Sequence, residues 1–210
     1  MIPTDDWLLF AAAAFVLVLT PGPNMIYVVS RSVCQGRRAG VISLAGVIGG
    51  ALVHMLAAAA GLSAILLAVP VAYEVLRWAG ALYLLCLGWQ AIGPGASSPF
   101  TPRQLPIDPP RRLFLMGMVT NLLNPKVAVF YLSIFPQFVS PARGSVFGQS
   151  LVLGFTQICV SFSINLLFVL TAAQLSAWFA RNPRWLVAQG YVMGSVMIGL
   201  AVRLAVESGR

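Results

Sequence analysis

Long uncharged stretches are the feature of this sequence that most restricts how the chain can fold. Five stretches of 18 or more residues carry no charge and a sixth contains only Lys126; in chain order they cover residues 7–30, 39–73, 78–102, 113–142, 144–180 and 185–202. A transmembrane helix takes about 20 mainly apolar residues. Only 9% of the 210 residues are charged, against about 25% in a soluble domain. The sequence therefore predicts an all-α integral membrane protein with six transmembrane helices in a lipid bilayer.

The first stretch is expected to stay in the protein as a transmembrane helix. Asp5 and Asp6 stand where a secretion signal would have a basic region, and no small-residue cleavage pattern follows Thr20.

Arginine residues gather in alternate connections between the stretches. They are Arg31, Arg37 and Arg38 after the first stretch, Arg103, Arg111 and Arg112 after the third, and Arg181 and Arg184 after the fifth. The second and third stretches are joined near residues 69–73, where there is no basic residue, and the fourth connection holds only Arg143. Cytoplasmic loops of membrane proteins carry such an excess, so both termini are predicted to face the periplasm. The net charge of +8 is then explained by arginine residues in the cytoplasmic loops. It does not indicate a nucleic-acid partner.

Few residues are available for chemistry within the predicted spans. They hold one histidine, His54, no Asp or Glu, and the widely separated Cys86 and Cys159; the third cysteine, Cys34, lies between spans. A membrane-embedded enzyme would need a carboxylate pair, a nucleophile with its base, or metal ligands. We therefore expect no enzyme activity, no metal site and no cofactor. A membrane-embedded enzyme and a non-transporting membrane scaffold remain the alternatives to a transporter.

The chain divides into two halves of three stretches each. A segment rich in Pro, Gly and Ser, GPGASSPFTPRQLPIDPP at 93–110, lies near the midpoint. Because three is odd, the second half must enter the membrane in the opposite direction. This predicts a single transporter domain, residues 1–210, with inverted repeats at 7–93 and 111–206 joined by a linker at 94–110.

Prolines interrupt the first stretch of each half. Pro21 and Pro23 flank Gly22, and Pro125 follows Asn124. A proline inside a helix displaces the carbonyl four residues back. Here the freed carbonyls would be those of Leu17, Leu19 and Asn121. Paired breaks at matching positions point to the substrate site of a transporter, although a single proline can also simply kink a transmembrane helix.

Three motifs closely resemble the LysE/RhtB-type translocators. They are TPGPN at 20–24, SRSVCQGRRAG at 30–40 and NPKVAVFYLSIFPQFV at 124–139. The resemblance extends over nearly the whole chain in length, stretch count and motif order. It implies a secondary transporter in the bacterial inner membrane that exports amino acids or small derivatives from the cytoplasm, with proton antiport as the proposed energy source.

The candidate substrate-binding residues surround the two breaks. They are Thr20, Pro21, Gly22, Pro23, Asn24, Asn121, Asn124, Pro125 and Lys126. Lys126 either binds the carboxylate of an amino acid or braces the broken helices by bonding freed carbonyls. The asparagines either bind the zwitterion or cap the half-helices. In the substrate hypothesis, the freed carbonyls of Leu17 and Leu19, with Asn24, meet the substrate ammonium group.

Three further features leave two interpretations open. His54 is the candidate proton carrier, although a lone histidine in a span commonly makes an interhelical hydrogen bond. Gln157 and Asn165, eight residues apart on one helix face, either line the path or bridge helices. Gly46 and Gly50 allow close helix packing, within the subunit by default or in a homodimer.

Overall fold

The described part of the chain is helical. The computed structural model describes residues 2–68 and 106–182, together with single residues within 78–89 and 184–206. Its elements are α1 (Thr4–Leu19), α2 (Pro23–Gln35), α3 (Arg37–Ala68), α5 (Pro110–Leu122), α6 (Pro125–Val129), the π-helix η1 (Phe130–Ile134), the 3-10 helices η2 (Phe135–Phe138) and η3 (Pro141–Arg143), and α7 (Val146–Arg181). No strand occurs among these residues. The predicted third and sixth stretches lie largely outside the described residues, as does most of the linker.

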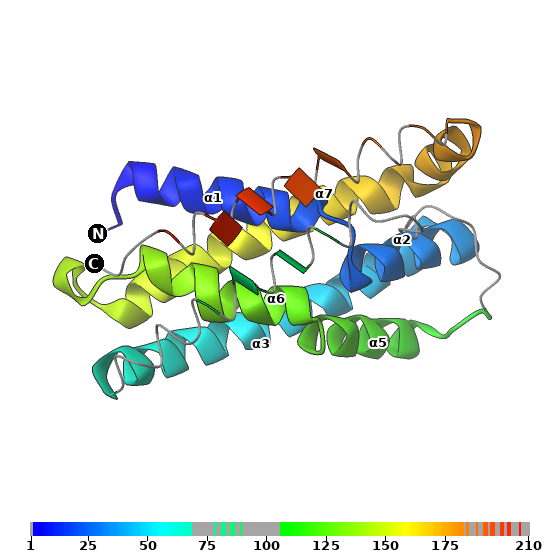
Figure 1. Cartoon of the computed structure of the whole chain (residues 1–210). Helices are drawn as coiled ribbons and strands as arrows, with labels where there is room; N and C mark the ends of the chain where they lie inside the picture. The colour runs from blue at the N-terminus through cyan, green and yellow to red at the C-terminus, as the bar shows by residue number, and fades with distance from the viewer. Residues whose placement is uncertain are drawn as a thin grey trace.

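Two single helices and two bent pairs account for four of the predicted spans (Figure 1). Helices α3 and α7 are each long and apolar enough to cross a bilayer. Helices α1 and α2 meet at 54°, and α5 meets the segment Pro125–Phe138 at 46°. The predicted break in the first helix of each half is therefore confirmed. The inverted relation between the halves stays a prediction.

Both breaks follow from local sequence. Thr20 is extended, as expected for a residue before proline. Gly22 is also extended and precedes Pro23, the first residue of α2. At the second break, Asn124 precedes Pro125 at the start of α6. A proline suits a first helical position because it has no N–H to leave unpaired there, so Pro23 and Pro125 each begin a helix after a break.

Glycines bring α3 and α5 into backbone contact. A Cβ atom on Gly46 would overlap the carbonyl oxygen of Phe114, and one on Gly117 would overlap that of Ser43. A Cβ on Gly50 would lie 2.8 Å from the Cβ of Asn121. The prediction that Gly46 and Gly50 pack within the subunit is confirmed, and Gly50 lets the Asn121 side chain lie against α3.

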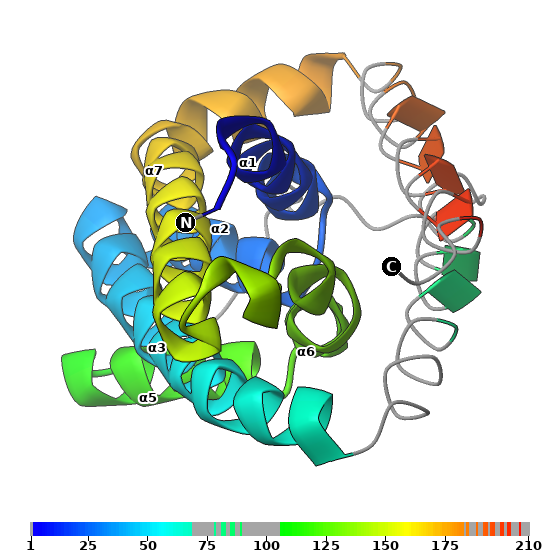
Figure 2. The ribbon, with the colours of Figure 1, turned by 90° about the vertical axis from the view of Figure 1, so that its left-hand side faces the viewer.

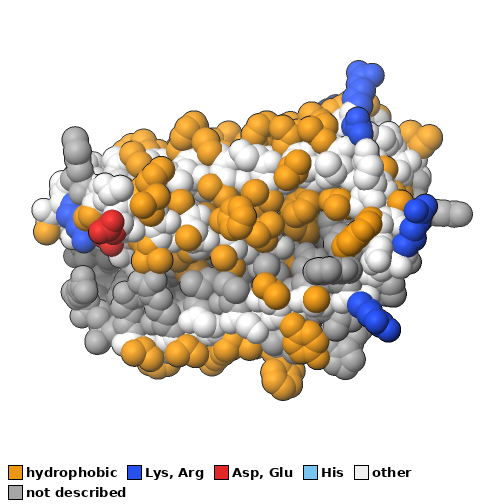
Figure 3. All heavy atoms as spheres, turned by 90° about the horizontal axis from the view of Figure 1, so that it is seen from above, with side chains coloured by type: hydrophobic (Ala, Val, Ile, Leu, Met, Phe, Trp, Pro, Cys, Tyr) orange, Lys and Arg blue, Asp and Glu red, His pale blue; other side chains and the backbone are white. Residues whose placement is uncertain are grey.

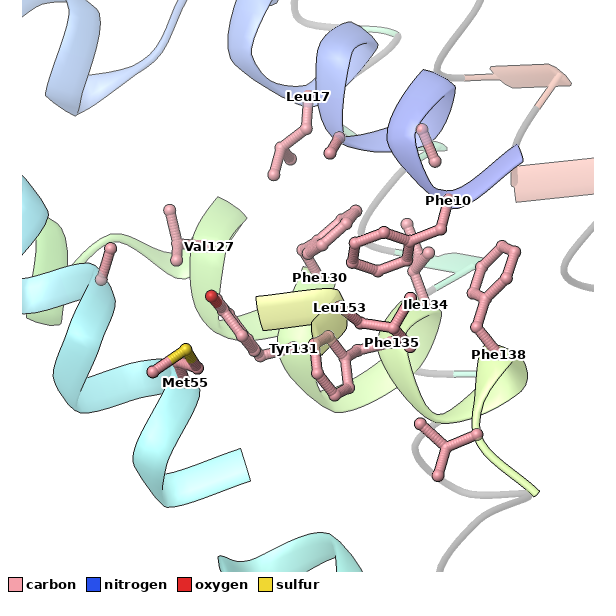
Figure 4. Packing of buried hydrophobic residues seen from close by; sticks show 14 of the residues in the cluster. Phe10, Leu17, Met55, Val127, Phe130, Tyr131, Ile134, Phe135, Phe138 and Leu153 are labelled. Atoms are coloured by element: carbon pink, nitrogen blue, oxygen red, sulfur yellow. The ribbon is translucent and has the colours of Figure 1, made fainter. Parts of the chain in front are cut away.

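The core consists of two apolar clusters along the bundle. The Phe10 cluster includes Phe10, Leu17, Ala51, Met55, Val127, Phe130, Tyr131, Phe135, Phe138, Leu153 and Ile158 (Figure 4). The Val28 cluster consists of Met25, Val28, Val29, Leu44, Val47, Val169 and Ala172. Seen along the bundle (Figure 2), the α6 segment is enclosed between α1 and α3, so the second break lies inside the protein.

The outer surface matches a protein surrounded by lipid. Large apolar side chains are exposed along α1, α3 and α7, among them Phe15, Leu56 and Phe155. In Figure 3 apolar side chains cover the middle of the molecule, while charged side chains lie at its two ends. We call the end that carries Arg37, Arg38, Arg111, Arg112 and Arg181 the arginine-rich end. The opposite end holds the ion pair of Asp6 with Arg143, at 2.6 Å.

Arg31 lies inside α2, which corrects its expected place in a loop. Only Gly36 separates α2 from α3, and the Arg31 side chain is 6% exposed. Its guanidinium group lies 2.7 Å from the carboxylate of Asp108 and donates to the Pro106 carbonyl at 3.2 Å. A buried ion pair is tolerated when its charges are paired and further hydrogen-bonded. These bonds hold the end of the linker against α2.

Candidate functional site

A layer of polar side chains separates the two apolar clusters at the level of the helix breaks. On the first broken helix, Leu17 belongs to the Phe10 cluster and Met25 to the Val28 cluster, with the break between them. On α7, the buried Ser161 and Asn165 lie between Ile158 of the Phe10 cluster and Val169 of the Val28 cluster. The members of this polar layer are Thr20, Asn24, Asn121, Asn124, Lys126, Ser161 and Asn165. Asn24 is half-buried and the others are buried.

Lys126 joins the second break to the first. It is the second residue of α6 and is 7% exposed. Its ammonium group donates to the backbone carbonyls of Leu17, at 2.8 Å, and Thr20, at 2.6 Å. Unpaired carbonyls at membrane depth are costly, so Lys126 stabilises the end of α1. The bracing contact predicted for this residue is present.

The carbonyls that Lys126 bonds differ in part from those expected. The Leu17 carbonyl is freed as predicted, but the second bond goes to Thr20 rather than Leu19. The Leu17 carbonyl is therefore bonded to Lys126 in this conformation and not to a substrate ammonium group, which corrects the hypothesis for Leu17. Gly22 provides the space, because a Cβ there would lie 3.0 Å from the Lys126 nitrogen and 3.2 Å from Cε.

The three predicted asparagines have different surroundings. Asn124 caps α6, since its side-chain oxygen accepts from the Lys126 backbone N–H at 3.0 Å. Asn24 is not a cap, because Gly22 occupies the N-cap position of α2. Each of these asparagines has one buried amide atom without a hydrogen-bond partner among the described residues: Oδ1 of Asn24, Oδ1 of Asn121 and Nδ2 of Asn124. The layer thus offers acceptors and a donor to a small polar ligand.

His54 contacts the second break. Its Nε2 atom lies 3.3 Å from the Asn121 carbonyl oxygen, which also accepts from the Asn124 backbone N–H at 3.0 Å. The imidazole ring stacks on Tyr131 at 5.7 Å. The structural alternative for His54, an interhelical hydrogen bond, is therefore present. Sequence reasoning did not identify Tyr131 as its neighbour.

Gln157 and Asn165 differ in the bonds that they make. Gln157 accepts from the Tyr131 hydroxyl at 2.9 Å and so bridges two segments, as predicted. Asn165 donates to the Ser161 carbonyl of its own helix at 2.8 Å. It makes no bridge in the described part of the chain, and its Oδ1 atom is buried without a partner there.

A groove separate from the polar layer lies at the end of the molecule that holds Asp6. It is lined by residues including Trp7, Arg143, Gln149 and Val152, none of which belongs to the polar layer. Among the described residues, no group of three His, Cys, Asp or Glu side chains could hold a metal ion. The polar layer is therefore the candidate site.

Known proteins identify the family. Residues 15–208 match the family model described as LysE type translocator. The chain belongs to the LysE type translocator family. A homoserine/homoserine lactone efflux protein of Salmonella typhimurium is 32% identical over 202 residues, which cover 95% of each chain. A leucine efflux protein of Enterobacter sp. is 28% identical over 196 residues, 93% of each chain. No solved structure matches this translocator.

Family membership sets the class of function. A LysE type translocator is a transporter and not an enzyme, and the apolar helices agree with a multi-pass membrane protein. The expected resemblance to this family is confirmed over most of the chain.

Proposed function

We propose that this translocator exports amino acids or small amino-acid derivatives from the cytoplasm across the inner membrane. The observation that carries the proposal is the polar layer, in which a buried ammonium group and unpaired amide atoms lie beside two broken helices. Irregular backbone at membrane depth is tolerated inside protein or along a cavity, and transporters place their substrates at such breaks. The relatives named for homoserine and leucine efflux support an amino-acid substrate.

Lys126 is the proposed partner of the substrate carboxylate. An ammonium group has three N–H donors, and two of them bond the Leu17 and Thr20 carbonyls. No salt bridge joins Lys126 to an acidic residue in the described part of the chain. A carboxylate at the third N–H would supply the missing negative charge, so bracing and substrate binding are compatible roles.

The preferred substrate has an uncharged side chain. The five acidic residues of the sequence, Asp5, Asp6, Glu74, Asp108 and Glu207, all lie outside the six predicted spans. Asp108 is already paired with Arg31 and Arg112. A second cationic group on the substrate would therefore meet the Lys126 charge with no carboxylate to balance it.

The remaining parts of the proposal concern architecture and energy. The two halves form inverted three-helix repeats, with both termini in the periplasm and the arginine-rich end in the cytoplasm, which the gathering of Arg37, Arg38, Arg111, Arg112 and Arg181 supports. Export is coupled to proton entry, and His54 is the candidate carrier because it is the one histidine of the chain. A homodimer is the proposed assembly.

Transport by purified protein in vesicles tests the function. Vesicles of neutral and anionic lipid, loaded with unlabelled L-leucine or L-homoserine, should accumulate the same labelled amino acid by exchange and return it chemically unchanged. Protein-free vesicles give the background rate. A chemically altered product would support the enzyme alternative. Background rates across a panel of the common amino acids and homoserine lactone would favour the scaffold.

A Lys126 variant separates the two roles of this residue. Lys126→Met should weaken competition by the amino acid much more than competition by its amide, which lacks the carboxylate. Lys126→Arg keeps the charge in a larger planar group, so partial loss is expected. An equal loss for acid and amide, at normal protein levels, would leave Lys126 as a brace and exclude it from carboxylate binding.

A further inference from the structure

Asn165 is a buried polar residue of α7 with an unused hydrogen-bond acceptor. It is 3% exposed. Its amide nitrogen donates to the Ser161 carbonyl at 2.8 Å and the Ser161 hydroxyl at 3.3 Å, which fixes the orientation of the amide. Its Oδ1 atom is buried and has no partner among the described residues. Buried polar atoms are nearly always hydrogen-bonded. This oxygen is therefore a candidate acceptor for an N–H or O–H group of a ligand.

The contact between α2 and α7 places Asn165 near the first break. The Ser32 hydroxyl donates to the Val169 carbonyl at 2.6 Å, and both helices run toward the arginine-rich end. Asn165 precedes Val169 by four residues, which is about one helical turn, so it lies one turn from this contact in the direction of the break. The same step along α2 leads from Ser32 to Val28, and one further turn leads to Asn24. Asn165 therefore lies at the edge of the polar layer that faces the arginine-rich end, about one turn from the level of Asn24.

The unpaired oxygens of this layer match one part of an amino acid. The carbonyls of Leu17 and Thr20 are occupied by Lys126, so a substrate ammonium group needs other acceptors. Within the polar layer, three buried amide oxygens without partners among the described residues remain, on Asn24, Asn121 and Asn165. An ammonium group carries three N–H donors. The number and chemistry of the acceptors thus fit this group, and no acidic side chain is needed.

We propose that Asn165 of α7 binds the ammonium group of the substrate, together with the Asn24 and Asn121 oxygens, while Lys126 binds the carboxylate. This inference rests on the proposed function, since it assigns a subsite within the same polar layer. It gives α7 a direct role in selecting α-amino acids over acids without the amino group.

The test combines a protein variant with a ligand variant. Wild-type protein in vesicles carries out exchange of labelled L-leucine, and unlabelled L-leucine is compared as inhibitor with 2-hydroxy-4-methylpentanoate, which has a hydroxyl in place of the ammonium group. If wild type exchanges L-homoserine instead, 2,4-dihydroxybutanoate is the analogue. Wild type should bind the amino acid roughly tenfold or more tightly than the hydroxy acid, as expected for a charge-assisted hydrogen bond. In Asn165→Leu this advantage should shrink by roughly tenfold.

Three controls distinguish the outcomes. Gln157→Leu, on the same face, should lower protein stability or rate and leave the ratio between the two ligands unchanged, because the Gln157 oxygen is bonded to Tyr131. Ser161→Ala removes the longer of the two bonds that orient the Asn165 amide, so it should lower the ratio less than Asn165→Leu does. Asn165→Ser, with a shorter side chain, replaces Asn165→Leu in this test if the Leu variant does not insert into the membrane.

Different results would overturn the ammonium subsite and the proposed export function. A wild type that binds both ligands equally, or an undiminished ratio in the Asn165 variants, overturns the ammonium subsite while export itself stands. Absence of exchange for every amino acid in the wild type would instead reject the proposed function.

Discussion

The space at Gly22 provides a direct test of the Lys126 brace. Gly22 is extended, with φ −169° and ψ 178°, a backbone conformation that any residue adopts, so a larger side chain causes no backbone strain there. A Cβ would lie 3.0 Å from the Lys126 nitrogen. Moving that nitrogen by about 0.3 Å would stretch bonds of 2.6 and 2.8 Å to about 2.9 and 3.1 Å, which are still within hydrogen-bonding range. Gly22→Ala should therefore weaken the two bonds without breaking them.

Gly22→Val should break both bonds, because its additional methyl groups compete for the space of the ammonium group. Interhelical hydrogen bonds in membrane proteins contribute about 0.6 kcal/mol on average and up to about 1.7 kcal/mol. Two such bonds give an expected loss of about 1–3 kcal/mol in the free energy of unfolding. Gly22→Ala should lose less than about 1 kcal/mol, since replacing glycine also stabilises a protein by about 0.4–1 kcal/mol through the unfolded chain.

A double-mutant cycle assigns the loss to Lys126. Unfolding free energies are measured in mixed micelles with rising fractions of denaturing detergent, for wild type, Gly22→Val, Lys126→Met and the double variant. The Gly22→Val effect should be at least about 1 kcal/mol smaller in the Lys126→Met background, because residues in contact are coupled. Additive effects would refute the reasoning, since the clash would then involve some neighbour other than the ammonium group.

Three further predictions concern topology, the first break and coupling. Reporter tags at either terminus should respond from the periplasm, with the 94–110 linker responding from the cytoplasm; cytoplasmic signals from both termini would reverse the orientation. The double variant Pro21→Ala, Pro23→Ala should insert normally but export little amino acid, because a straightened helix would close over the polar layer; full export would reduce the break to an ordinary kink. His54→Gln should abolish pH-gradient-driven export and retain exchange, whereas unchanged gradient dependence would exclude His54 as the proton carrier.

The sequence was sufficient to predict the broken helices because backbone constraints act locally. Pro21, Pro23 and Pro125 determine where N–H groups are absent, and each lies at a break in the structure. The uncharged stretches likewise predicted α3 and α7. The family resemblance was readable for the same reason, since two of its three motifs, those at 20–24 and 124–139, contain these breaks.

The partners of the polar side chains were not predictable, because they depend on the register between distant helices. Lys126 meets Leu17, 109 positions earlier in the chain, and one chain cannot show by its sequence alone which carbonyl it reaches. The position of Arg31 was mistaken for the same reason. Its partner, Asp108, belongs to a linker that composition had marked only as irregular.

The two breaks are linked by side chains, which suggests how substrate binding is communicated through the protein. Lys126, at the start of α6, holds the end of α1, while His54 on α3 contacts the carbonyl of Asn121 at the end of α5. Neither break can straighten or bend further without changing one of these bonds. A carboxylate bound to Lys126 would compete with the carbonyls for the ammonium charge and would weaken the bonds that fix the bend between α1 and α2. A ligand shifts a conformational equilibrium only by its differential interaction with the two states. Substrate binding at Lys126 would therefore shift the equilibrium between the present bend of α1 and α2 and a conformation in which the Lys126 bonds are weakened.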